Sequence, residues 1–218
     1  MRQGGTRCGT LAVHQPEARY YGAGQAQVLY ARYLELAYNF SVLALTLTRV
    51  NAMTPQAFVA EFGGVFEHSP WIAELAFAGR PFESVAALHG AMVDAVRGAV
   101  RHRQLALLNA HPELAGKEAQ IGALTQSSSA EQVSAGLNAL NREEMEIIAR
   151  SNRQYREKFG FPFIIAVRQH TKHSIFSEFQ RRLANEADTE LAICLDQVFV
   201  ITRLRLDNLF ASKPGSAI

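Results

Sequence analysis

From about residue 54 onward, apolar side chains recur every three or four positions, with polar residues between them. In residues 84–100, for example, Val85, Leu88, Met92 and Val96 fall on one face of a helix. This spacing favours helices over strands, because strands would show strict alternation. The pattern and its flanking residues predict helices over about residues 26–47, 54–63, 70–79, 84–100, 101–109, 141–159, 174–185 and 189–210.

Local capping signals mark several helix ends. Thr54-Pro55 combines an N-cap residue with a proline at the first helical position, and Ser69-Pro70 repeats that combination. Asn141 and Glu144 have the spacing of a capping box, and Gly160 is placed to end the helix that the box opens. These signals predict where the helices begin and end independently of the apolar spacing.

One segment has strand character. Residues 161–167 are aromatic or β-branched and are interrupted by Pro162. Because no second such segment is available to pair with it, we expect a buried extended segment that lines a pocket. The predicted class is therefore all-α, a single-domain helical bundle-like fold of about seven to nine helices with one short extended segment.

Composition indicates an ordinary globular protein. The 218 residues suit one domain, and 48% hydrophobic and 19% charged residues are typical values. A net charge of +2 gives no reason to expect a nucleic-acid partner. The apolar run in residues 34–47 is shorter than the ~20 residues of a membrane span, so no membrane contact is expected. Cys8 and Cys194 imply no disulfide framework, which favours a reducing, cytoplasmic location.

The composition changes near residues 51–54, after a glycine-rich beginning. We therefore predict an N-terminal extension over residues 1–52, a main domain over residues 53–212 and a tail over residues 213–218. The extension could be an appended helix or an upstream segment, and its residues favour neither interpretation.

His111 is the first candidate for chemistry, because it stands directly before Pro112 at the end of the helix predicted over residues 101–109. Proline disfavours helical geometry in the residue before it, so His111 should leave the helix. A histidine there can cap the last carbonyl groups of the helix. It can also point into a cleft, where a side chain that titrates near pH 6.5 suits acid–base catalysis.

Arg205 is the second candidate. It shares one face of the last predicted helix with apolar residues, and an arginine in that position either extends to the surface or faces a buried anion. The other positions of this face, in steps of four and three, are Leu191, Leu195, Val198, Thr202 and Leu209.

Two further patterns have competing interpretations. Ser128 and Glu131 have capping-box spacing, which is a structural role, but a helix N-terminus also favours an anionic ligand, so both roles can coexist. His170 and His173 have a spacing that some metal sites use. No carboxylate follows them and Lys172 lies between, so we predict no metal site.

Five separated motifs occur in one order in this chain: residues 67–74, 111–117, 124–132, 158–168 and 202–206. With these motifs, residues 53–211 resemble the family of 2-oxo-4-hydroxy-4-carboxy-5-ureidoimidazoline (OHCU) decarboxylases. The resemblance implies a cofactor-free, cytoplasmic enzyme of urate degradation that forms (S)-allantoin and CO2 from a small-molecule substrate. It also implies a homodimer.

The resemblance further implies the roles of individual residues. His111 would be catalytic, and Glu131 would hold it. Substrate-binding positions would be Pro70, Pro112, Ser128, Gln132, Ile164, Ile165, Ala166, Val167, Arg168 and Arg205. The rival hypothesis is a non-enzymatic helical interaction module in which the histidine, the capping box and the arginine are all structural.

Overall fold

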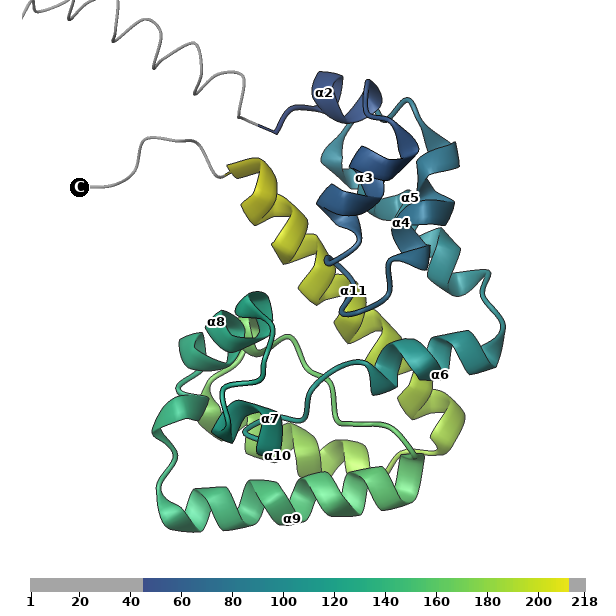
Figure 1. Cartoon of the computed structure of the whole chain (residues 1–218). Coiled ribbons are helices and arrows are strands. Elements are labelled where there is room, and N and C mark those ends of the chain that lie inside the picture. Colours follow the sequence, from purple (N-terminus) through teal and green to yellow (C-terminus); the bar gives the residue numbers. More distant parts are fainter. Residues whose placement is uncertain (1–44, 212–218) are drawn as a thin grey trace, which may run out of the picture. The chain divides into compact units, whose positions relative to one another are not determined.

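The computed structural model describes residues 45–211, and residues 1–44 and 212–218 lie outside the described part (Figure 1). The described part consists of helices and contains no strand, which confirms the all-α prediction. Its α-helices are α2 (Leu47–Asn51), α3 (Pro55–Phe62), α4 (Trp71–Ala76), α5 (Val85–Arg97), α6 (Arg101–Asn109), α7 (Lys117–Gln120), α8 (Gln126–Ser134), α9 (Arg142–Phe159), α10 (Lys172–Leu183) and α11 (Ala187–Ala211). The short 3-10 turns are η1 (Phe77–Gly79), η2 (Leu137–Ala139) and η3 (Val167–Gln169).

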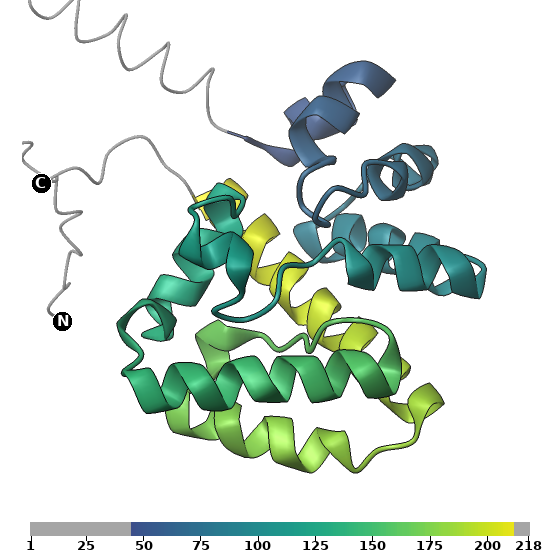
Figure 2. The same cartoon turned by 60° about the horizontal axis from the view of Figure 1, so that its bottom comes forward.

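Helix α11 lies between two groups of helices (Figures 1 and 2). It packs against α5 and α6 on one side and against α9 on the other, and α9 packs against α10. Helices α3, α4 and α5 follow one another in contact. Both groups contribute to one continuous apolar core, which includes Phe62, Leu88, Tyr155 and Val198.

Most predicted helix ends are confirmed. Thr54 and Ser84 accept hydrogen bonds from the third residue of the helices that follow them, and Asn141 forms the predicted capping box with Glu144. Gly160 ends α9 with a φ of 77°, a left-handed conformation that glycine adopts at little cost. These ends depend on residues three or four positions apart, which explains why sequence alone predicted them.

Two predicted helix starts are wrong. The Ser69 side chain does not cap α4, because Pro70 itself occupies the N-cap position in a helical conformation. Helix α10 begins at Lys172 rather than at residue 174, since Thr171 is the N-cap and Ser174 completes the capping box. The helix predicted over residues 26–47 lies almost entirely outside the described part, as does the tail over residues 213–218.

The predicted extended segment is confirmed, and a buried ion pair holds it. Arg182 and Glu190 are 1% and 0% exposed and lie 2.6 Å apart. Arg182 Nη1 donates to the Ile164 carbonyl at 2.7 Å, and Gln197 Oε1 accepts from the Ala166 amide at 2.9 Å. The segment from Phe161 is therefore fixed to α10 and α11 through its own backbone.

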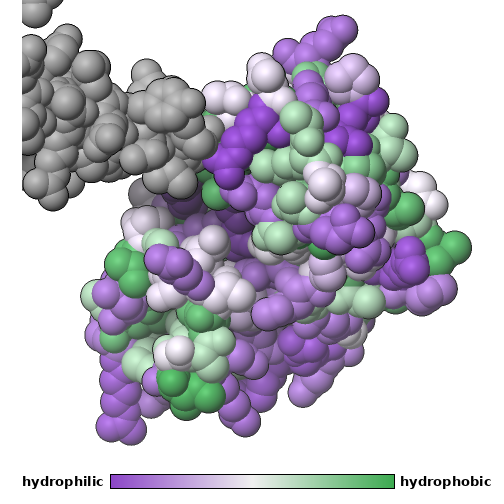
Figure 3. Space-filling model, turned by 45° about the horizontal axis from the view of Figure 1, so that its top comes forward, coloured by the Kyte–Doolittle hydropathy of each residue, from purple (hydrophilic) through white to green (hydrophobic). Residues whose placement is uncertain are grey.

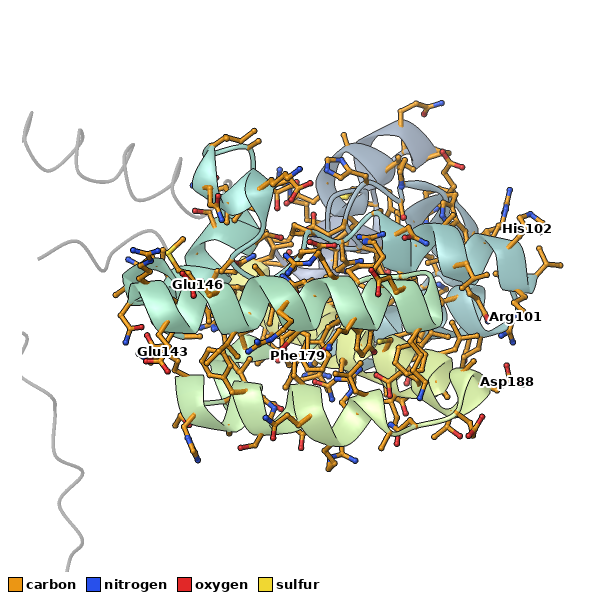
Figure 4. All side chains as sticks on the ribbon, turned by 90° about the horizontal axis from the view of Figure 1, so that it is seen from below. Arg101, His102, Glu143, Glu146, Phe179 and Asp188 are labelled. Atoms are coloured by element: carbon orange, nitrogen blue, oxygen red, sulfur yellow. The ribbon has the colours of Figure 1, made fainter. Side chains whose placement is uncertain are left out.

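Aromatic rings also pack the extended segment against α10. Phe179 lies in the layer between α9 and α10 (Figure 4), and its ring stacks on that of Phe163 with centroids 3.8 Å apart. The exposed ion pair between Arg101 and Asp188 joins the first turns of α6 and α11. Such an exposed pair contributes little to stability, so the apolar and aromatic contacts dominate.

The surface mixes residue types. On the face shown in Figure 3, hydrophobic residues form separate small groups among hydrophilic ones. None of the helices in residues 45–211 has the length and apolarity that crossing a membrane would need.

The predicted domain boundary at residues 52 and 53 falls inside packed structure. Val50 of α2 is fully buried in the core. The Asn51 side chain donates to the Phe82 carbonyl at 2.9 Å and accepts from the Phe82 amide at 2.8 Å. The residues of α2 therefore belong with the helices that follow them.

A chain that begins at Met53 should be less stable than a chain that begins at Leu45. It lacks one buried valine and both Asn51 hydrogen bonds, which together should lower the melting temperature by roughly 5 °C or more. Thermal unfolding of the two chains, followed by circular dichroism, measures the difference. Equal melting temperatures would show that α2 contributes nothing to stability.

Candidate active site

His111 leaves α6 as predicted, one residue beyond the Ala110 C-cap. Its Nδ1 donates to the Leu107 carbonyl at 2.8 Å, which assigns the ring proton to Nδ1 and the lone pair to Nε2. The side chain is 7% exposed, and its Nε2 has no hydrogen-bond partner among the described residues. Both interpretations of the sequence therefore apply, because one nitrogen caps the helix while the other remains available.

Burial lowers the pKa of His111 to about 4. The hydrogen bond to Leu107 and the negative charge of Glu67 act in the opposite direction, while the charges of Arg205 and His68 lower it further. The expectation that this side chain titrates near pH 6.5 is therefore corrected. At neutral pH His111 is an uncharged imidazole whose Nε2 can accept a proton.

Arg205 faces buried anions, so extension to the surface is excluded. The predicted face of α11 is confirmed, since Leu191, Leu195, Val198, Thr202 and Arg205 are all buried. Arg205 Nε and Nη2 each donate to Glu131 at 2.8 Å, and Nη2 also lies 3.2 Å from Glu67 Oε1. Nη1 donates to the Val65 carbonyl at 3.2 Å.

Glu67 is the residue of this cluster that the sequence predictions missed. It is 1% exposed and accepts hydrogen bonds from Thr125 and Ser128 as well as from Arg205. Burial raises the pKa of its carboxyl, but Arg205 and the Ser128 hydroxyl outweigh that effect, so the net pKa lies below the ordinary value. An acidic residue directly after the apolar pair Val65 and Phe66 was the available signal.

The predicted capping box of Ser128 and Glu131 is wrong. Helix α8 begins earlier, and its N-cap is Thr125, whose hydroxyl accepts from the Ser128 amide. Ser128 is thus the third residue of the helix, and its hydroxyl donates to Glu67. Glu131 is bonded to Arg205, whereas the Nδ1 of His111 is bonded to Leu107, so no hydrogen bond joins these two predicted catalytic residues.

Most predicted site residues meet at a small cavity of about 40 Å³. Gln132 also holds the chain after His111, because it accepts from the Ala115 amide at 2.9 Å. The predicted residues that line this small cavity are His111, Pro112, Ser128, Glu131, Gln132, Ile164, Ile165, Val167 and Arg205.

A larger cavity of about 760 Å³ adjoins the first, because His111 and Pro112 line both. Glu67 lines this large cavity too. Arg168 is exposed and borders a third cavity, whose lining shares Glu131 and Arg205 with the small cavity. Pro70 is exposed at the start of α4 and lines neither cavity that contains His111.

Ala166, the remaining predicted position, is buried, and its amide is bonded to Gln197. Within residues 45–211, no three His, Cys, Asp or Glu side chains come together as they would around a metal ion, and this includes His170 and His173. The arrangement of His111 beside charged groups held by Arg205 suits proton transfer.

The model of the OHCU decarboxylase family matches residues 51–207. The chain is 44% identical over 169 residues to a 2-oxo-4-hydroxy-4-carboxy-5-ureidoimidazoline decarboxylase of Haloferax volcanii, covering 78% of this chain and 98% of that protein. It is 35% identical over 173 residues to the mouse protein of the same name, covering 79% and 97%.

Solved structures show the same fold. A crystal structure of (S)-allantoin synthase matches with a TM-score of 0.61 and 28% identity, covering 76% of this chain and 54% of that one. A crystal structure of OHCU decarboxylase in the presence of (S)-allantoin matches with a TM-score of 0.57 and 23% identity, covering 70% and 99%.

The lowered pKa of His111 predicts a pH-dependent loss of stability. Between the ordinary pKa of 6.5 and the folded-state value of about 4, the unfolded chain takes up a proton that the folded chain does not. Stability is therefore lost as the pH falls through this window, by about 2 kcal/mol at pH 4.5. Urea unfolding at pH 7 and 4.5 should show a smaller loss for His111→Asn than for the parent, and equal losses would contradict the assignment.

Arg205→Lys should destabilise the fold, because an ammonium group cannot reproduce the planar fork that joins Glu67 and Glu131. A weakened buried ion cluster should cost about 2–4 kcal/mol in unfolding free energy. Arg203→Lys is the matched control, since Arg203 is 42% exposed and pairs with Asp207 one turn along the same helix. Its cost should stay within about 0.5 kcal/mol. Similar costs for both variants would refute a central role for Arg205.

Proposed function

The chain belongs to the OHCU decarboxylase family, and we propose that it is a cofactor-free carboxy-lyase. It converts 2-oxo-4-hydroxy-4-carboxy-5-ureidoimidazoline to (S)-allantoin and CO2 in urate degradation. The observation that carries the proposal is the buried Nε2 of His111, which has no partner within residues 45–211 and lies by cavities lined by Glu67, Glu131 and Arg205, in a chain with such relatives.

Loss of CO2 leaves an electron pair at the ring carbon that bore the carboxylate. The neighbouring ring C=N bond accepts this pair, so that a carbon–carbon double bond forms and the ring nitrogen takes a proton from solvent. The Nε2 of neutral His111 then accepts the hydroxyl proton as the carbonyl group forms. One proton then adds to one face of the ureido-bearing carbon, which gives a single enantiomer, and the cationic His111 gives up the proton it had accepted, so that the neutral ring is restored. In sum, one solvent proton replaces CO2.

Arg205 contributes to this site mainly by holding other groups. A guanidinium has five N–H groups, and the contacts to Glu131, Glu67, Ser128 and Val65 occupy all but one on Nη1. Arg205 can therefore give a substrate oxygen one hydrogen bond while it keeps both glutamates. A contact through two hydrogen bonds to a substrate carboxylate would require Arg205 to release Glu131.

The extended segment supplies the remaining polar contacts. The Ile164 carbonyl and the Ala166 amide are already bonded to Arg182 and Gln197. Successive residues of an extended chain point their N–H and C=O groups in opposite directions, so those of Ile165 point away from Arg182 and Gln197, and Ile165 is one of the residues that line the small cavity. A neighbouring donor and acceptor suit the amide groups of a ureido or hydantoin ring.

The non-enzymatic module is the less favoured alternative. A purely structural cluster gives no reason to bury an imidazole nitrogen without a partner, which costs free energy. We also propose a homodimer in the cytoplasm. Family resemblance supports the dimer, and the free buried thiol of Cys194 is consistent with a reducing compartment.

His111→Asn should leave the protein folded and lower kcat by about 10² or more, because it removes the proton acceptor. The substrate can be made in the assay by oxidising urate and hydrolysing the first product. Loss of its absorbance measures turnover, and circular dichroism of the allantoin formed measures handedness.

His102→Asn, an exposed histidine of α6 (Figure 4), is the matched control and should keep parental turnover. Turnover of the parent after exhaustive chelation tests the cofactor-free part of the proposal. A parent that does not accelerate formation of one enantiomer, or a folded His111→Asn protein with parental kcat, would contradict the proposed function.

A further inference from the structure

Glu67 is the carboxylate that links the charged cluster to His111. Its side chain lines the large cavity together with His111 and donates nothing, so it acts there only through its charge and its acceptor oxygens. Thr125 contacts both oxygens, at 3.1 and 3.3 Å, and Ser128 and Arg205 donate to Oε1. A carboxylate with this many donors is held in place and ionised.

The backbone next to Glu67 also supports a specific placement. His68 has a φ of 39°, a left-handed value that is uncommon for residues other than glycine. Such conformations cost free energy and are frequent where a side chain must be held in a particular position. The turn after α3 therefore accepts an unfavourable conformation directly beside the buried carboxylate.

Glu131, the carboxylate that the family resemblance implied as the partner of His111, is bonded to Arg205 instead. Both of its oxygens accept hydrogen bonds from Arg205. The charges that act on His111 come from Glu67 and His68 in the turn before α4 and from Arg205 of α11. Of the two carboxylates bonded to Arg205, Glu67 is thus the one that acts on the imidazole.

The charge balance of the cluster favours a cationic His111. One positive charge on Arg205 is shared by two carboxylates, so the cluster carries one excess negative charge while His111 is neutral. Uptake of a proton by His111 removes that excess. In a buried site with little solvent screening, this compensation is larger than it would be in water.

We propose that Glu67 is a positioning residue of the reaction, which holds Ser128 and Arg205 and supplies the negative charge that stabilises His111 when the imidazole takes up a proton. The role resembles that of the third group in a catalytic triad, but it acts through space rather than through a hydrogen bond to the ring. The link to turnover rests on the proposed function, whereas the electrostatic link between the two side chains does not.

Glu67→Gln tests this inference, because it keeps the shape of the side chain and removes the charge. The titration of His111 in the ligand-free protein can be followed by NMR, with its signal assigned by its absence in His111→Asn. Removing the charge should lower the midpoint by about one pH unit. The same change should reduce kcat about tenfold, with a smaller change in KM, since one unit corresponds to a factor of ten.

Two comparisons make the result specific. Glu74→Gln, at an exposed glutamate of α4, should keep the parental midpoint and kcat. Glu131→Gln should keep the parental His111 midpoint whatever its effect on turnover. An unchanged midpoint in folded Glu67→Gln, or an equal downward shift in Glu131→Gln, would overturn the proposal.

If Glu67→Gln does not fold, Glu67→Asp replaces it. Aspartate keeps the negative charge but is shorter by one methylene group. The His111 midpoint and kcat should therefore both fall, but by less than the amounts expected for Glu67→Gln. Parental values of both in Glu67→Asp would then count against the inference. The titration needs no substrate, so an inactive parent contradicts the proposed function alone, and an unshifted titration in an active enzyme contradicts this inference alone.

Discussion

The site depends on one buried arginine shared by a buried carboxylate and a half-buried one. Arg205 is 7% exposed, and its partners Glu67 and Glu131 are 2% and 14% exposed. Each of these charges would be costly to bury alone, because its hydration is lost without compensation. The cluster is therefore stable only when α8, α11 and the turn after α3 are all in place, and this requirement fixes the wall of the cavity on which His111 opens.

A second buried pair holds the extended segment that also lines the small cavity. Arg182 and Glu190 lie 2.6 Å apart in the core, and Arg182 also holds the Ile164 carbonyl. A segment without helix or sheet partners must satisfy its backbone groups in another way. Here the side chains of α10 and α11 do so for the Ile164 carbonyl and the Ala166 amide.

His111 shows how one residue can be structural and chemical at once. The hydrogen bond from Nδ1 to Leu107 completes the end of α6 and sets the tautomer. Burial then keeps the ring neutral, with its lone pair on Nε2. The same contacts that stabilise the helix end therefore prepare the proton acceptor. Its basicity also depends on the charges that the turn after α3 and helix α11 bring near it.

The sequence by itself determined the features that depend on near neighbours along the chain. Examples are the helical class, the capping box at Asn141, the end of α9 at Gly160 and the departure of His111 from its helix, because each is decided by residues within about four positions. The apolar face of α11 likewise followed from its periodicity.

Tertiary structure alone decided which charges meet. Arg205 lies 74 residues from Glu131 and 138 residues from Glu67, and no local pattern joins residues at those distances. The pair spacing of Ser128 and Glu131 suggested a local cap, but Thr125 had already capped the helix, so both side chains were free to face Arg205 and Glu67. The basicity of His111 was also undecided by the sequence, because it results from burial and from charges brought together only by folding.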